Sequence, residues 1–122
     1  MAVITVPVTE EGIVISGETA QALGCRTGSL AEVEIRVLPS AEEIQDRALY
    51  YIVHHLGDAV YVGDPIWLSD AWKLPLKVKG LEGVFGHLIL SPRGEVIEAR
   101  STSRMELREA IRAARANLPP AR

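Results

Sequence analysis

The residues best suited to binding chemistry are arginines near the C-terminal end of the sequence. Arg100, Arg104, Arg108, Arg112 and Arg115 follow one another at spacings of four, four, four and three residues. Residues three or four apart share one face of an α-helix, so the last four should form a single stripe. Because a guanidinium makes paired hydrogen bonds to phosphate or carboxylate, the stripe could bind DNA or an acidic partner. The alternative is a solvated face whose arginine stems cover apolar surface.

Two tryptophans, Trp67 and Trp72, are candidate anchors for a protein partner. Both lie in segments that we expect to be strands, and an indole combines a large apolar area with a polar N–H. Residues five apart on one straight strand point to opposite faces. We therefore expect one tryptophan in the core and the other on the surface.

The other side chains that could bind a metal or react chemically are not spaced as a metal or catalytic site requires. His54 and His55 are adjacent, so their side chains diverge on a helix, and no CxxC or HxxxH spacing accompanies them. Cys25 follows the expected end of a short helix, where the helix dipole disfavours a thiolate. Three aspartates recur every six residues in turn-like surroundings: Asp58, Asp64 and Asp70. We predict no metal site here.

The sequence also lacks the motifs of common enzymes. It contains no P-loop, no dinucleotide-binding glycine motif and no Ser-His-Asp order with supporting context. We therefore predict a protein without catalytic residues or cofactors, whose function comes from binding.

The arginines and tryptophans belong to a segment, residues 40–122, that predicts a helix, an antiparallel sheet and a second helix. Ser40 should cap the first helix, which ends at Gly57. Strands are expected at 60–68, 72–78, 85–90 and 95–99, with a hairpin turn at 91–94. The last helix should run over 103–117, with an apolar face of Leu107, Ile111, Ala114 and Leu118, and with Pro119 and Pro120 after it.

The preceding segment, residues 1–38, predicts a small β unit with one short helix. Strands are expected at 2–8 and 13–15, around a turn at Gly12. Ser16 should cap the helix and Gly24 should end it. The last strand, residues 31–37, alternates apolar and charged residues, so one of its faces should be buried.

This N-terminal segment is too short to form a sufficient core alone, since chains below about 40 residues rarely do. Its apolar faces must be buried against something else. One alternative is a second copy of the segment, which gives a homodimer. The other is the C-terminal segment of the same chain, which gives one monomeric domain.

A family resemblance covers the same residues. The runs Glu11–Glu18, Leu23–Ser29 and Glu32–Ile35 combine a glycine turn, a β-hydrophobic pair, a short helix ending in Leu-Gly and an alternating strand. This pattern resembles the AbrB/MazE/SpoVT swapped-hairpin domain. The resemblance implies an α+β homodimer in which two chains interleave their hairpins in one small barrel. It also implies a DNA-binding transcriptional regulator or an antitoxin.

The charge of the N-terminal segment departs from that family's pattern. Basic residues are usual at the first turn and along the short helix, whereas this chain has Glu11, Gly12, Ser16, Gly17 and Ala20 there. Residues 1–38 hold five acidic residues and two arginines, a net charge of −3, whereas residues 100–122 carry +4. Because DNA affinity depends on neutralised phosphates, any DNA contact should use Arg26, Arg36 and the C-terminal arginines.

The alternative function is a protein–protein interaction module that keeps the dimerising fold without binding DNA. A second resemblance agrees with it. Residues 41–100 are similar to PepSY-type modules in a strand that opens with Trp72 and a later turn at Gly94-Glu95-Val96. That likeness implies a non-catalytic interaction domain.

The length and composition of the chain exclude several classes of protein. The chain has 122 residues, 48% of them hydrophobic, with a net charge of −3. Such a composition excludes a wholly disordered chain. No run approaches the 20 or so apolar residues of a membrane span, so we expect no membrane contact. A single cysteine and the absence of a signal-peptide pattern predict a cytoplasmic protein.

Overall fold

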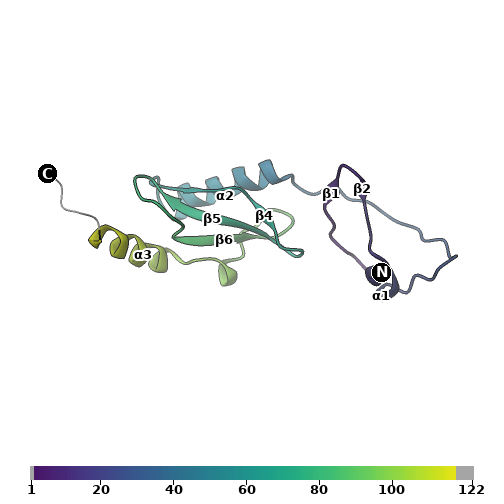
Figure 1. The fold of residues 1–122 in the computed structure, drawn as a ribbon. Coiled ribbons are helices and arrows are strands. Elements are labelled where there is room, and N and C mark those ends of the chain that lie inside the picture. Colours follow the sequence, from purple (N-terminus) through teal and green to yellow (C-terminus); the bar gives the residue numbers. More distant parts are fainter. Residues whose placement is uncertain (1, 118–122) are drawn as a thin grey trace. The chain divides into compact units, whose positions relative to one another are not determined.

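The structure is a computed structural model that describes residues 2–117. The chain divides into two compact units, Met1–Val37 and Leu38–Arg122, here called the N-terminal and C-terminal units. Each is described by itself (Figure 1). Helices and antiparallel strands occur together in the chain, so the fold is α+β, as predicted.

The C-terminal unit begins with helix α2 (Ala41–His55). The Ser40 hydroxyl accepts a hydrogen bond from the Glu43 N–H, which confirms the predicted cap. Three residues at helical spacing are fully buried: Ile44, Ala48 and Ile52. The helix ends before Gly57, whose φ of 107° suits only glycine.

The sheet is antiparallel and centred on β5 (Trp72–Val78). Strand β6 (Gly86–Leu90) pairs with one edge of β5, while β3 (Val60–Val62) and β4 (Ile66–Trp67) pair in succession with the other. The single strand predicted over 60–68 is thus broken at 63–65. Pairing continues across the break, because the Gly63 N–H donates to the Pro75 carbonyl at 3.0 Å.

The two faces of the sheet differ in burial. Along β5, Leu74, Leu76 and Val78 are at most 1% exposed, whereas the residues between them are half-buried. The buried side packs against α2, which lies behind the sheet in Figure 1. Leu107 from the last helix belongs to the same core. The main hydrophobic cluster therefore lies on one side of the sheet, and Ile89 is the partner of Lys73 on the other side, where it is 6% exposed.

The strand predicted at 95–99 is wrong. Val96 makes only an isolated bridge to Leu90, and Glu98–Arg100 forms a short 3-10 helix, η1. Side chains from the next two residues occupy that edge instead: Ser101 Oγ accepts from the Ile89 N–H and Thr102 Oγ1 accepts from the His87 N–H. The turn at 91–94 is confirmed by the Gly94 N–H donating to the Ser91 carbonyl at 2.9 Å.

Gly86 should not tolerate a side chain, because Thr102 lies against its backbone. A Cβ at this position would come within 2.5–2.8 Å of three Thr102 atoms. We expect Gly86→Ala to lower the free energy of unfolding by about 1–3 kcal/mol, the usual cost of overpacking. Chemical denaturation should measure it. Gly17→Ala is the control, since its Cβ meets nothing within 4 Å; equal effects in both variants would contradict the packing argument.

The N-terminal unit consists of a small hairpin, β1 (Val8–Thr9) and β2 (Gly12–Ile13), and helix α1 (Gly17–Ala22). The predicted Ser16 cap and the stop at Gly24, with φ of 89°, are both confirmed. The longer strands are not. Residues 2–7 and 31–39 have no regular structure, so the predictions for 2–8 and 31–37 are wrong in the single chain.

The N-terminal unit has no core of its own. None of its described residues is buried, and the predicted inner face of 31–37 is exposed, with Val33 at 61% and Val37 at 91%. Eleven large apolar residues of the unit are exposed: Val3, Ile4, Val8, Ile13, Val14, Ile15, Leu23, Leu30, Val33, Ile35 and Val37. The missing strands have a physical reason: a strand needs a hydrogen-bonding neighbour, and these segments have none among the described residues of their own unit.

Candidate anion-binding site

The candidate site is built on helix α3 (Arg104–Ala116). A reciprocal capping box begins the helix: Ser103 Oγ accepts from the Glu106 N–H, and Glu106 Oε1 accepts from the Ser103 N–H, both at 3.1 Å. Leu107 is 2% exposed and Ile111 packs against the same core, so they fix the helix to the C-terminal unit. Leu118, Pro119 and Pro120 lie outside the described residues.

Four arginines, Arg104, Arg108, Arg112 and Arg115, form the α3 arginine face, and all are exposed. Their spacing places them beside the buried stripe of Leu107 and Ile111 rather than opposite it. In the described part of the chain none of the four forms an ion pair. The face therefore presents four guanidinium groups to solvent.

An open hollow of about 530 Å³ borders this face. Arg108, Arg112 and Arg115 form one wall of the hollow, and Asp58 is the one acidic residue among the described residues that line it. The remainder is mostly apolar: Leu56, Gly57, Ala59, Val60, Val78 and Ile111. Arg104 does not line it. An anionic group could contact the guanidinium groups while apolar atoms next to it rest on the floor.

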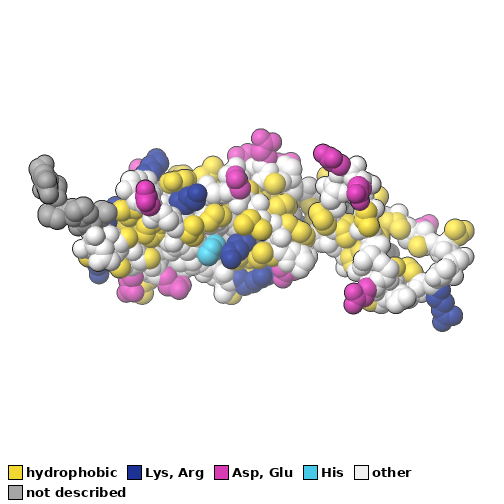
Figure 2. Space-filling view, viewed as in Figure 1, with side chains coloured by type: hydrophobic (Ala, Val, Ile, Leu, Met, Phe, Trp, Pro, Cys, Tyr) yellow, Lys and Arg dark blue, Asp and Glu magenta, His cyan; other side chains and the backbone are white. Residues whose placement is uncertain are grey.

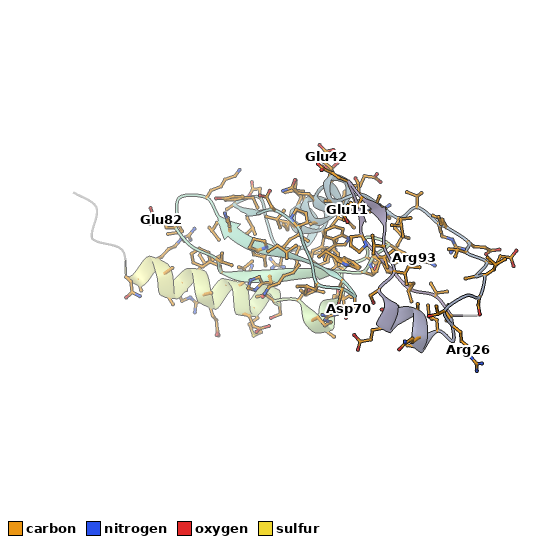
Figure 3. The ribbon with its side chains drawn as sticks, turned by 45° about the vertical axis from the view of Figure 1, so that its right-hand side comes forward. Glu11, Arg26, Glu42, Asp70, Glu82 and Arg93 are labelled. Atoms are coloured by element: carbon orange, nitrogen blue, oxygen red, sulfur yellow. The ribbon has the colours of Figure 1, made fainter. Side chains whose placement is uncertain are left out.

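Arg100, the first arginine of the predicted series, is engaged elsewhere. It precedes α3, and its Nη1 lies 2.9 Å from Asp70 Oδ2. Both side chains are substantially exposed, at 43% and 64%, so the pair contributes at most about 1 kcal/mol. Figure 3 marks Asp70 in the turn after β4.

The other two predicted arginines belong to the N-terminal unit. Arg26 follows α1 and extends away from its loop (Figure 3), and Arg36 lies in the irregular segment 31–39; both are exposed. The five acidic residues of the unit are exposed as well: Glu10, Glu11, Glu18, Glu32 and Glu34. The described surface of this unit is therefore acidic overall.

The prediction that Trp67 and Trp72 occupy opposite faces is wrong. The chain reverses between them, at Ser69 with φ of 83°, and the Leu68 N–H donates to the Ala71 carbonyl at 2.8 Å. The tryptophans become cross-strand partners in β4 and β5, with ring centroids 5.2 Å apart in an edge-to-face contact. Trp72 packs on the core, and each ring covers part of the other.

The histidines on α2 contact aromatic rings rather than one another. His54 lies against Tyr50 and His55 against Tyr51 in tilted ring contacts, with centroids 4.3 and 4.4 Å apart. Cys25 is half-buried beyond the end of α1. Across residues 2–117, no three His, Cys, Asp or Glu side chains are grouped so that they could hold a metal ion.

The capping box that begins α3 should make the stability of this helix depend on pH. Its hydrogen bonds from Ser103 hold the pKa of Glu106 below the usual value. Because the pKa is lowered, the Glu106 carboxylate stabilises α3 at pH values above the pKa that this group has in the unfolded chain. This contribution disappears as the pH falls through the pKa of Glu106 in the folded chain. We expect Ser103→Ala to cost about 1 kcal/mol at neutral pH.

Helicity followed by circular dichroism between neutral and acidic pH measures both effects. Glu106→Gln should retain the helix at neutral pH yet lose the acid-dependent part of its unfolding. Glu109→Gln removes an exposed carboxylate of the same helix that has no capping role. If Glu109→Gln flattened the pH profile as much as Glu106→Gln, the capping box would not be its origin.

One basic surface of the C-terminal unit was not predicted from the sequence. Outward-facing residues of the sheet include Lys73, Lys77 and His87, which come from β5 and β6. Burial and the charge of Lys73 hold the pKa of His87 below its usual value. The alternation Lys-Leu-Pro-Leu-Lys at 73–77 was the available signal, since it places both lysines on one side of a strand.

Chemically, the described residues present features that suit an anionic ligand: a stripe of exposed guanidinium groups, a hollow beside it and a sheet face with two lysines. No helix in the described residues is both long enough and apolar enough to cross a membrane. Comparisons of the chain with protein-family models, with curated proteins and with solved structures find no match.

Proposed function

We propose that the protein is a homodimeric, AbrB-like regulator that binds DNA through the arginine faces of its two α3 helices. The N-terminal units of two chains share one hydrophobic core in this proposal, in the manner of a swapped-hairpin domain. The single cysteine fits a reducing compartment such as the cytoplasm.

The observation that carries the proposal is that none of the described residues 2–37 is buried, although eleven large apolar side chains among them are exposed. Fully burying one such side chain stabilises a fold by about 1.5–3 kcal/mol. A second copy offers the same faces, and a symmetric pair doubles every contact. Pairing would also supply strand neighbours for residues 31–37, whose apolar and charged alternation suits a half-buried strand.

The α3 arginine face is the preferred DNA contact because of its charge. Phosphate neutralisation supplies most of the sequence-independent affinity for DNA. The N-terminal unit has a net charge of −3 over residues 1–38, and in a dimer this charge doubles. The four arginines of α3 have no ion-pair partner among residues 2–117, so they are free to meet phosphates.

The direct test of the dimer is light scattering coupled to size exclusion on the full chain. We expect the mass of two chains of 13.3 kDa each, unchanged on dilution into the low micromolar range. A mass of one chain at all concentrations would overturn the shared core.

The acidic N-terminal unit supports a second candidate, an interaction module that dimerises but does not bind DNA. The α3 arginine face would then receive an acidic protein, with the same paired hydrogen bonds to carboxylates. A stable dimer that is not retained by DNA even at low salt would favour this candidate over the regulator.

A further inference from the structure

The outer sheet face is a second basic surface, separate in its residues from the α3 arginine face. Seven outward-facing residues define it, of which Ile89 is only 6% exposed: Tyr61, Ile66, Lys73, Pro75, Lys77, His87 and Ile89. Cross-strand pairing places Tyr61 beside Lys77, and Ile66 beside Lys73. Partners in register on neighbouring strands share a face, so these side chains form one surface.

This face is not part of the hydrophobic core. The buried residues of α2, together with Leu107 of α3, belong to the core that includes Leu74 and Leu76. On the outer sheet face Ile66 remains 56% exposed and Tyr61 39% exposed. Figure 2 shows hydrophobic side chains there beside a histidine and several Lys or Arg side chains.

The charge of the face has one sign. None of the strands β3, β4, β5 and β6 contains Asp or Glu, and acidic side chains lie at the margins of this view (Figure 2). Lys73 and Lys77 are four residues apart on one strand, a separation of about 13 Å. His87 is paired with Pro75, which lies midway between the two lysines. Two cations thus flank a largely apolar centre.

We propose that the outer sheet face binds an extended acidic segment of a partner protein. The segment carries two carboxylates four residues apart, which meet Lys73 and Lys77, and an apolar residue between them that rests on Pro75 and Ile66. An extended peptide repeats at the same 3.3–3.4 Å per residue as β5, so carboxylates at positions i and i+4 match the lysine spacing.

A polypeptide fits this surface better than a single-stranded nucleic acid does. Bases bind by stacking on aromatic side chains, whereas this face offers only two rings, Tyr61 and the His87 imidazole, among aliphatic side chains. Its centre instead matches an aliphatic side chain flanked by acids.

The test uses the full chain and a synthetic peptide that has glutamates four residues apart and a leucine midway between them. Binding is followed by NMR, with the His87 imidazole as a local probe. A bound carboxylate should raise the pKa of His87 towards its ordinary value, because it offsets the charge of Lys73. A peptide with its glutamates two residues apart should bind about tenfold more weakly.

Charge reversal locates the contact. Lys73→Glu and Lys77→Glu should each weaken binding severalfold, and together about tenfold or more. Arg93→Glu is the matched control, because it reverses one exposed charge in the turn after β6 and outside the face; it should leave the affinity unchanged. Circular dichroism verifies that each variant is folded.

Three outcomes would overturn the proposal. The first is no binding of the peptide at millimolar concentration. The second is binding that Arg93→Glu weakens as much as Lys73→Glu does. The third is binding of a single-stranded oligonucleotide, but not of the peptide, at the lysines, which would assign the face to nucleic acid. None of them depends on whether α3 binds DNA.

Discussion

A chain that carries both Val33→Asp and Ile35→Asp should be monomeric, whereas the unaltered chain should be a dimer. In the single chain these side chains are 61% and 69% exposed, so their replacement costs the lone N-terminal unit little. In a shared core each would be buried, and each occurs twice. At about 1.5–3 kcal/mol for every buried side chain, dimerisation should weaken a thousandfold or more. Light scattering across a dilution series measures this shift.

The matched control lies on the alternate positions of the same segment. Glu32→Gln with Glu34→Gln alters two neighbours of the same residues, without placing charge where burial is expected. It should keep the dimer or tighten it, since two acidic units repel each other less once four carboxylates are gone. If Val33→Asp with Ile35→Asp dimerised as tightly as the unaltered chain, residues 31–37 would not belong to the shared core.

The elements predicted well from sequence are those determined by local chemistry. Helix α2 begins after the Ser40 cap and α3 after Ser103, as the capping residues indicated. Strand β5 covers 72–78 as predicted, because its alternation reflects a strand that is buried more deeply on one face than on the other. Such signals lie within a few residues of the structure that they specify.

The failures involve partners that are distant in sequence. Residues 31–37 have a strand pattern, but no neighbouring strand is supplied by their own unit, so the pattern alone does not produce a strand. At 95–99, Ser101 and Thr102 occupy the edge of β6 through their hydroxyl groups. The Trp67–Trp72 contact depends on a reversal at Ser69 that no glycine marks.

The candidate site divides in the same way. The α3 arginine face follows from spacing alone, because helical periodicity is local. The hollow could not be predicted, since its wall combines α3 with residues 56–60 and with Val78 of β5. The pairing of Arg100 with Asp70, thirty residues earlier, is likewise a property of the folded chain.

Replacing Arg104 and Arg108 by glutamate should abolish the proposed binding to DNA. Four arginines on one helix that meet four phosphates would give a slope of about −3.6 in log K against log salt, and two helices would give up to twice this value. Reversing two charges on each helix removes half of those contacts and adds repulsion. The affinity of the dimer for a duplex should fall about a hundredfold or more at moderate salt. Fluorescence anisotropy over a salt series measures both quantities.

Arg47→Glu with Arg93→Glu is the control for this experiment. It changes the net charge by the same amount at two exposed positions outside α3, so it separates a contact on the helix from a general charge effect. It should leave the salt slope unchanged and reduce affinity only slightly, because neither side chain belongs to α3 or lines the hollow beside it. Equal losses in the two double variants would mean that DNA responds to overall charge, and the α3 arginine face would no longer be its binding site.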